Sequence, residues 1–251
     1  MPQLTYISEK AASDLVKSDV TAHVELGHIK NPEGFAQHHL DTAKIAYETA
    51  ASILKQHPFL GREVIPEEIR TAGYVHDLKK TMTGTPLHEI PTAYEILNNL
   101  QLKLVMGGTE AERRSTLKRI AGIIPPDFAL YESIKGAFEP GQKSLYPIND
   151  ERRAELDYLM KNLSSDGHIL TLEEFALPLR LDQQIALYAD LTNVEGKVVP
   201  IEQRLDEAAE RYGNAQSKYY DLIYAQLVEE VRSRILVVDA NVRGLLNTSS
   251  R

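Results

Sequence analysis

The sequence predicts an all-α protein, because most of it reads as helices that Pro and Gly separate from one another. Two of these helices begin with Pro followed by acidic residues, at Asn31-Pro32-Glu33 and Pro66-Glu67-Glu68, as helix N-termini often do. The last one repeats apolar residues at helical spacing over 215–246. With 251 residues, 43% hydrophobic and 25% charged, the chain can form one large helical domain, 1–251.

The expected helices follow one another along the chain. The first spans about 31–56, before His57-Pro58, and the next runs from Pro66 towards Asp77. Further helices are expected over 86–100, 109–123, 150–163, 179–193, 200–212 and 215–246.

The sequence does not decide the roles of two parts of the chain. The least regular part, roughly 125–170, is rich in Pro and Gly, and we interpret it as an inserted segment or lid. The long C-terminal helix over 215–246 is apolar on one face, so it either completes the core or forms a homodimer.

Charge and composition exclude several classes of function. The net charge of −8 argues against a nucleic acid polymer as partner, but a bound cation would still allow a small phosphorylated substrate. The chain has no Cys, so any metal must be held by His, Asp or Glu. There is neither a basic segment followed by an apolar run at the start nor a run of 18 apolar residues. We therefore expect a cytoplasmic protein that does not enter a membrane.

The sharpest feature is the pair His76-Asp77 at the end of a predicted helix. A dipeptide of this kind is weak on its own, but two other positions support it. His38 lies on a helix with an Ala-rich face, and Asp190 interrupts the apolar run from Ile185 to Leu191. A carboxylate on an apolar face is costly unless a cation or hydrogen bonds satisfy it. These residue types therefore indicate a metal site.

The order His, His-Asp and a distant Asp resembles the HD superfamily of metal-dependent phosphohydrolases. The run over 76–80, His-Asp-Leu-Lys-Lys, is similar to the family's usual His-Asp-Ile-Gly-Lys, and Ala189-Asp190 resembles the end of its pattern. The resemblance covers about 35–100 and 180–212 and leaves the middle unmatched. It implies an HD-domain-like helical bundle with an irregular inserted segment.

Two adjacent histidines compete for the first position of this pattern. The family's helix has Leu two residues after its ligand, Ala at five, an aliphatic residue at seven and Ala at eight. Counting from His39 does not give these types. Counting from His38 gives them, at Leu40, Ala43, Ile45 and Ala46. We expect His38 to be the ligand and His39 to support the site or contact the substrate.

The resemblance implies that His38, His76, Asp77 and Asp190 hold one or two divalent ions. Such a mixed N and O set suits Mn, Fe, Co, Ni or Zn and leaves Mg open. Asp77 would bridge two metals, or orient the attacking water beside a single one. Lys80 matches the family's Lys and would contact a substrate phosphate during catalysis.

Two neighbouring positions depart from the family or fit it less closely. Lys79 stands where the family usually has Gly, so the turn after Asp77 cannot use a glycine conformation. Lys79 and Lys80 also fit a solvated basic helix end. His88 is out of step by one residue with a region where some members place ligands, and we retain it as a candidate for substrate binding.

The resulting hypothesis is a metal-dependent phosphohydrolase that cleaves a phosphate ester, with a nucleotide as the favoured substrate. A nucleotide monophosphatase, a cyclic-nucleotide diesterase and a guanosine-polyphosphate hydrolase fit the same ligands. The alternative is a catalytically silent HD-type module for signalling or ligand sensing, which loss of a ligand would indicate. A helical scaffold without metal would leave the ordered pattern as coincidence.

Overall fold

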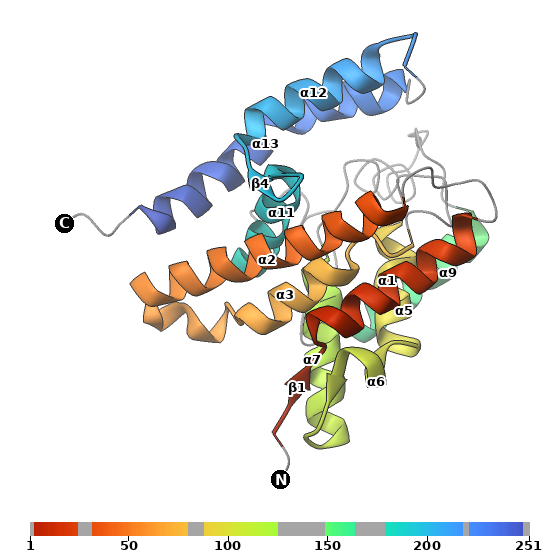
Figure 1. Cartoon of the computed structure of the whole chain (residues 1–251), viewed down its shortest axis with the longest axis vertical. Coiled ribbons are helices and arrows are strands. Elements are labelled where there is room, and N and C mark those ends of the chain that lie inside the picture. Colours follow the sequence, from red (N-terminus) through yellow and green to blue (C-terminus); the bar gives the residue numbers. More distant parts are fainter. Residues whose placement is uncertain are drawn as a thin grey trace.

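The all-helical prediction is confirmed by the computed structural model of the chain, which describes residues 3–24, 32–79, 88–124, 149–163, 179–217 and 221–247 (Figure 1). The helices are α1 (Glu9–Val24), α2 (Pro32–Gln56), α3 (Pro66–Val75), α5 (Glu89–Asn98), α6 (Gln101–Leu104), α7 (Glu110–Ile123), α9 (Asp150–Leu163), α11 (Leu181–Thr192), α12 (Ile201–Gly213) and α13 (Leu222–Leu246). A 3-10 helix, η1 (Pro58–Arg62), follows α2. Helices α1 and α6 were not expected from the sequence.

Two short antiparallel strand pairs join the helices. Strand β1 (Thr5–Tyr6) pairs with β2 (Val105–Met106), and β3 (Asn193–Val194) pairs with β4 (Lys197–Val198). The second pair is a hairpin that leads directly from α11 into α12. It therefore fixes how α12 leaves the end of α11.

The helix starts follow their local chemistry. Pro66 occupies the first turn of α3, where its missing N–H is no loss. Thr109 caps α7 by accepting from the N–H of Glu112, whose side chain accepts in return from the N–H of Thr109. These caps satisfy backbone donors that no helical bond could reach.

The centre of the core is the contact between α2 and α3. Both helices face each other with small residues, and the buried ones include Ala43, Ala46, Ala72 and Gly73. A Cβ on Gly73 would lie 2.7 Å from Cα of Ala43, so the two backbones approach as closely as glycine allows. Helix α1 packs against α2, and α11 lies across α2 and α3 (Figure 1).

Part of the segment expected as an insertion, 125–170, forms helix α9 of the core. Helix α9 packs against α5 and α7, with Leu156, Leu159 and Leu163 buried. The rings of Tyr94 and Tyr158 also meet, 5.1 Å apart between centroids. This part of the expected insertion belongs to the core, whereas 125–148 and 164–170 lie outside the described residues.

The C-terminal helix α13 packs against α11, α12 and α2 (Figure 1). Its buried residues recur at helical spacing, namely Val228, Val231, Ile235, Val238 and Val242. This burial favours the first of the two alternatives, a helix that completes the core. None of the described helices combines the length and the apolar character needed to cross a membrane.

We expect Gly73→Ala to lower the free energy of unfolding by about 1–3 kcal/mol, because the added methyl group must push α2 and α3 apart. The matched control is Gly244→Ala in α13, where no atom lies within 4 Å of the added Cβ. That change should stabilise the protein by about 0.5–1 kcal/mol through helix propensity. Urea unfolding of both variants measures the difference, and equal effects would contradict the close approach.

Candidate metal centre

Four side chains from three helical segments lie close together, the same four that the resemblance to the HD superfamily implied as ligands. His38 comes from α2, His76 and Asp77 from the turn after α3, and Asp190 from α11. One oxygen of Asp190, Oδ1, lies 3.0 Å from Nε2 of His38 and 3.3 Å from Nε2 of His76. His76 Nε2 is in turn 3.8 Å from Asp77 Oδ2. We call these residues the four-residue cluster.

The orientation of His76 suits metal binding. It directly follows α3, and its Nδ1 donates to the carbonyl of Gly73 at 2.9 Å. This bond leaves Nε2 to face the cluster. His76 is 2% exposed, and its Nε2 lies 3.3 Å from Asp190 Oδ1 and 3.8 Å from Asp77 Oδ2. This buried nitrogen therefore faces two carboxylates, as a metal ligand beside other ligands would.

Asn193 supports His38, and the sequence analysis did not identify it. Its Nδ2 lies 3.2 Å from His38 Nδ1, 3.1 Å from the His38 carbonyl and 2.9 Å from Thr42 Oγ1. Its Oδ1 accepts from the N–H of Gly196. The available signal was its spacing, because Asn193 follows Asp190 by three residues and so lies about one helical turn further on.

The charges within the cluster stabilise one another. Burial alone would lower the pKa of His76, but the carboxylates of Asp77 and Asp190 outweigh it and raise that pKa to about 9. Burial would likewise raise the pKa of Asp190, but the charge of His76 and the hydrogen bond from His38 hold it well below its usual range. Without a metal, the cluster therefore carries a proton on His76 at neutral pH.

His39 lies behind the cluster and is fully buried. Its Nδ1 donates to the carbonyl of Tyr74 at 2.8 Å, and its ring lies 4.9 Å from that of His76. Burial, reinforced by the charge of His76, holds the pKa of His39 well below its usual range. Of the two roles expected for His39, this position fits support of the site rather than contact with a substrate.

His88 lies against the cluster, although its match to the family was out of step. Its Nε2 is 2.7 Å from Asp77 Oδ1 and 3.2 Å from Glu89 Oε1, and all three residues are buried. His88 thus fixes the carboxylate of Asp77 from the side away from His76.

Lys79 is not the solvated helix end that its sequence also suggested. Its Nζ lies 3.4 Å from Asp19 Oδ1 on α1 and 3.8 Å from Glu95 Oε1 on α5, and its side chain is only 15% exposed. Lys79 has no positive φ, so the turn needs no glycine here. Lys80, the expected phosphate contact, lies outside the described residues.

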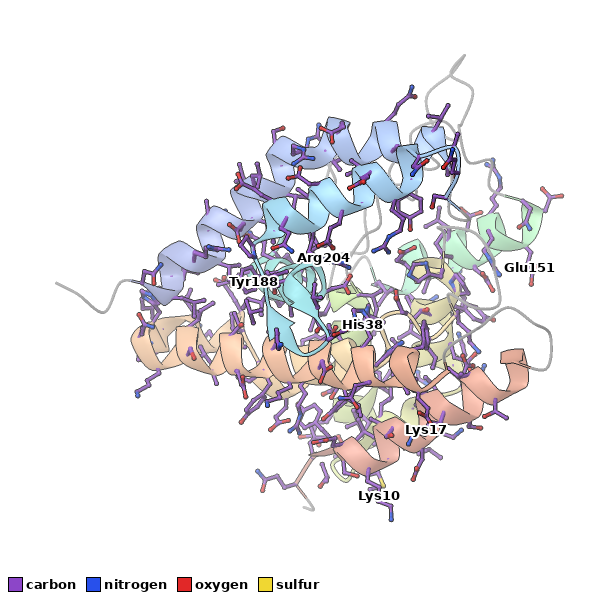
Figure 2. The ribbon with its side chains drawn as sticks, turned by 45° about the horizontal axis from the view of Figure 1, so that its top comes forward. Lys10, Lys17, His38, Glu151, Tyr188 and Arg204 are labelled. Atoms are coloured by element: carbon purple, nitrogen blue, oxygen red, sulfur yellow. The ribbon has the colours of Figure 1, made fainter. Side chains whose placement is uncertain are left out.

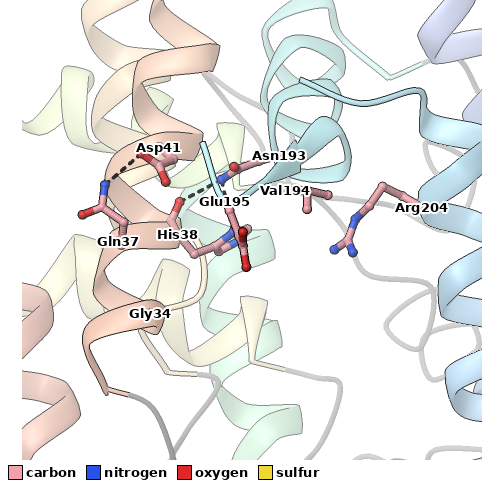
Figure 3. Close-up of a pocket in the computed structure, with 8 residues that line it drawn as sticks. All are labelled: Gly34, Gln37, His38, Asp41, Asn193, Val194, Glu195 and Arg204. Carbon is pink, nitrogen blue, oxygen red and sulfur yellow. Dashed lines mark hydrogen bonds between the residues drawn. The ribbon is translucent and has the colours of Figure 1, made fainter. Parts of the chain in front are cut away.

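The cluster opens to solvent on one side only. The side chains of His38 and Asp190 are each 28% exposed, whereas those of His76 and Asp77 are 2% and 6% exposed. His38 also lines a pocket of about 340 Å³ between α2 and α12 (Figures 2 and 3). A ligand that reaches the cluster must therefore approach along the edge formed by His38 and Asp190.

The cluster fits a divalent cation. The group that could share one ion is His38, His76 and Asp77, and Asp190 Oδ1 lies beside both histidines. Such a mixed set of imidazole and carboxylate donors binds transition metals well. Atoms that share one ion at about 2.1 Å lie about 3–4 Å apart. The measured separations of 3.0, 3.3 and 3.8 Å fall in that range, and single ligand atoms of His38, His76 and Asp77 all lie within 4.8 Å of one another.

Comparisons of the chain with models of known protein families, with curated proteins and with solved structures found no match. The likeness to the HD superfamily therefore rests on the cluster residues and their order along the chain.

We expect the affinity for Mn²⁺ to rise about tenfold for each pH unit between pH 7 and about 9, and to level off above that. The reason is that metal binding needs neutral His76, whose pKa of about 9 leaves it protonated below this pH. Competition with a chelator at a series of pH values measures the affinity.

The variant His76→Gln should lose the site. The control is His57→Gln. His57 lies just beyond the end of α2, where its Nε2 bonds the carbonyl of Leu245, and this variant should keep the parent's dependence of Mn²⁺ affinity on pH. An affinity that stays constant from pH 7 to 9 would mean that the ion does not replace the proton on His76.

Proposed function

We propose that the protein is a metal-dependent phosphohydrolase that cleaves the phosphate ester of a small molecule, with a nucleotide as the favoured class. The observation that carries this proposal is the four-residue cluster, whose one open edge borders a pocket. A divalent ion held by His38, His76, Asp77 and Asp190 supplies Lewis-acid activation of the phosphoryl group and of water. The resemblance to the HD superfamily points to the same chemistry.

Asp77 is the residue best placed to orient the attacking water. His88 holds one of its oxygens at 2.7 Å, which fixes the carboxylate plane, and the other oxygen faces His76 in the cluster. In the reaction a water oxygen bonds to phosphorus, the ester P–O bond breaks, and the alcohol leaves with a proton. A fixed carboxylate accepts the proton from water efficiently because it needs no rearrangement.

The buried surroundings of the cluster strengthen this proposal. His39 lies behind the cluster with its ring against that of His76, and Leu78 and Val75 are buried on either side of the His-Asp pair in the sequence. Charges act more strongly in such a water-poor site than at the surface. The rigid position of the ligands also lowers the cost of ordering them when an ion binds.

We expect Asp77→Asn to lower kcat for a phosphate monoester by about 10²–10⁴-fold, since the amide cannot accept the proton of water. We expect Asp190→Ala to lose the metal as well. The control Asp14→Asn alters an exposed carboxylate on α1 and should change neither. Elemental analysis and assays on a panel of phosphate esters, each with added Mn²⁺, measure both properties.

The same measurements separate the alternatives. Metal without hydrolysis in the parent protein would replace this proposal with a silent ligand-sensing module. If Asp190→Ala retains as much metal as the parent, the ion binds elsewhere in the protein. If the parent takes up no metal at all, the protein is better described as a helical scaffold.

A further inference from the structure

The pocket beside the cluster is lined mainly by residues other than the proposed metal ligands, of which only His38 takes part. His38, Gln37 and Asp41 of α2 line one side, Asn193 and Glu195 of the β3–β4 hairpin line the next, and Arg204 of α12 closes the other. Figure 3 shows Arg204 reaching from α12 towards the hairpin, opposite His38. Its volume of about 340 Å³ lies at the low end of small-molecule sites, about 300–1,000 Å³. It therefore suits one small ligand.

Arg204 is the one cation among the described residues that line this pocket, and its hydrogen-bonding capacity is only partly used. Nη1 donates to Glu207 one turn along α12 at 3.0 Å. Nε is buried and has no hydrogen-bond partner within the described chain. A guanidinium carries five N–H donors in a plane that matches a phosphate group. The free donors beside a phosphohydrolase-type cluster point to an anionic ligand.

Glu195 gives the pocket a second distinctive feature. It has a φ of +50°, and among the described residues it is the only one other than glycine with a positive φ. It precedes Gly196 in the two-residue β3–β4 turn, where Asn or Gly is usually preferred. A glutamate here costs conformational energy that an Asn would largely avoid. We take this conformation as a reason to examine the Glu195 side chain as part of the pocket.

The charges around the pocket limit which phosphorylated ligand it accepts. Asp41 and Glu195 both line it, so the described lining carries two carboxylates and one guanidinium. A single phosphate can be balanced by the metal and Arg204. Each further phosphate would lie near these carboxylates, whose repulsion is strong at short range. Carboxylates accept hydrogen bonds from hydroxyl groups without such a penalty.

Building on the proposed function, we propose that this pocket binds the substrate and that Arg204 binds its phosphate. The substrate is a phosphate monoester with a neutral, hydroxyl-bearing remainder, such as a nucleoside or sugar monophosphate, and not a polyphosphate. Asp41 and Glu195 contact the hydroxyl groups and discriminate against additional phosphates. Of the three activities that fit the ligands alone, this proposal favours a nucleotide monophosphatase over a cyclic-nucleotide diesterase and a guanosine-polyphosphate hydrolase.

The role of Arg204 is tested by the binding of inorganic phosphate to the Mn²⁺-loaded protein, measured by isothermal titration calorimetry. Arg204→Met should weaken phosphate binding at least tenfold, and Arg204→Lys should weaken it less. Both should keep the metal content and the Tm of the parent. The control Arg211→Met removes an exposed cation two turns further along α12, outside the pocket, and should leave phosphate binding unchanged.

Parent affinity in both Arg204 variants would overturn the phosphate site, as would an equal loss in Arg211→Met. This test needs no turnover, so its outcome is separate from that of the proposed function. Phosphate binding that depends on Arg204, without hydrolysis of any ester, would contradict the phosphohydrolase proposal and support the phosphate site. Hydrolysis with an unchanged KM in Arg204→Met would support the phosphohydrolase proposal and contradict the phosphate site.

The preference for a monoester is tested by AMP and ADP as competitors of phosphate binding, with the metal content measured again afterwards. We expect AMP to compete at least tenfold better than ADP in the parent. Glu195→Gln removes one negative charge with little change of shape and should narrow that gap. Equal competition by AMP and ADP in the parent, or the same gap in Glu195→Gln, would contradict the assigned role of the carboxylates.

Discussion

Helices α2 and α3 meet backbone to backbone, because a methyl group at position 73 would lie 2.7 Å from Cα of Ala43. His38 lies five residues before Ala43 and His76 three residues after Gly73, so this contact sets their separation, 5.4 Å between ring centroids. Gly73 also accepts the bond from His76 Nδ1 that turns Nε2 towards the cluster. The missing side chain at position 73 thus allows the close approach of two ligands, and the backbone carbonyl of the same residue orients one of them.

The buried charges of the cluster need positive charge close to the carboxylates. Two carboxylates, those of Asp77 and Asp190, meet two imidazoles in a place from which water is largely excluded. In the metal-free protein the proton on His76 supplies one positive charge. A divalent ion would supply two and would replace that proton at Nε2 of His76. Proton and ion would therefore compete for the same nitrogen.

The sequence predicts the helices and the members of the cluster, because both follow local patterns: helical spacing, Pro at helix starts, and His38 in register with Ala43. It does not predict contacts that depend on how distant helices pack. Lys79 pairs with Asp19 of α1, a helix that the sequence analysis did not identify. Asn193 and Arg204 look like ordinary polar residues until the fold places Asn193 beside His38 and Arg204 across the same pocket. Supporting residues of this kind have no signature in a single sequence.

The segment from α11 through β3–β4 to α12 joins the metal site to the pocket over a short stretch of chain. It supplies Asp190 to the cluster and Glu195 and Arg204 to the pocket. Asn193 lies between them, and its one amide group serves both: Nδ2 contacts His38, while Oδ1 accepts from Gly196 in the turn that presents Glu195. A change that tilts the turn would therefore also move the support of a metal ligand. In the proposed function, this shared amide would couple substrate recognition to metal binding.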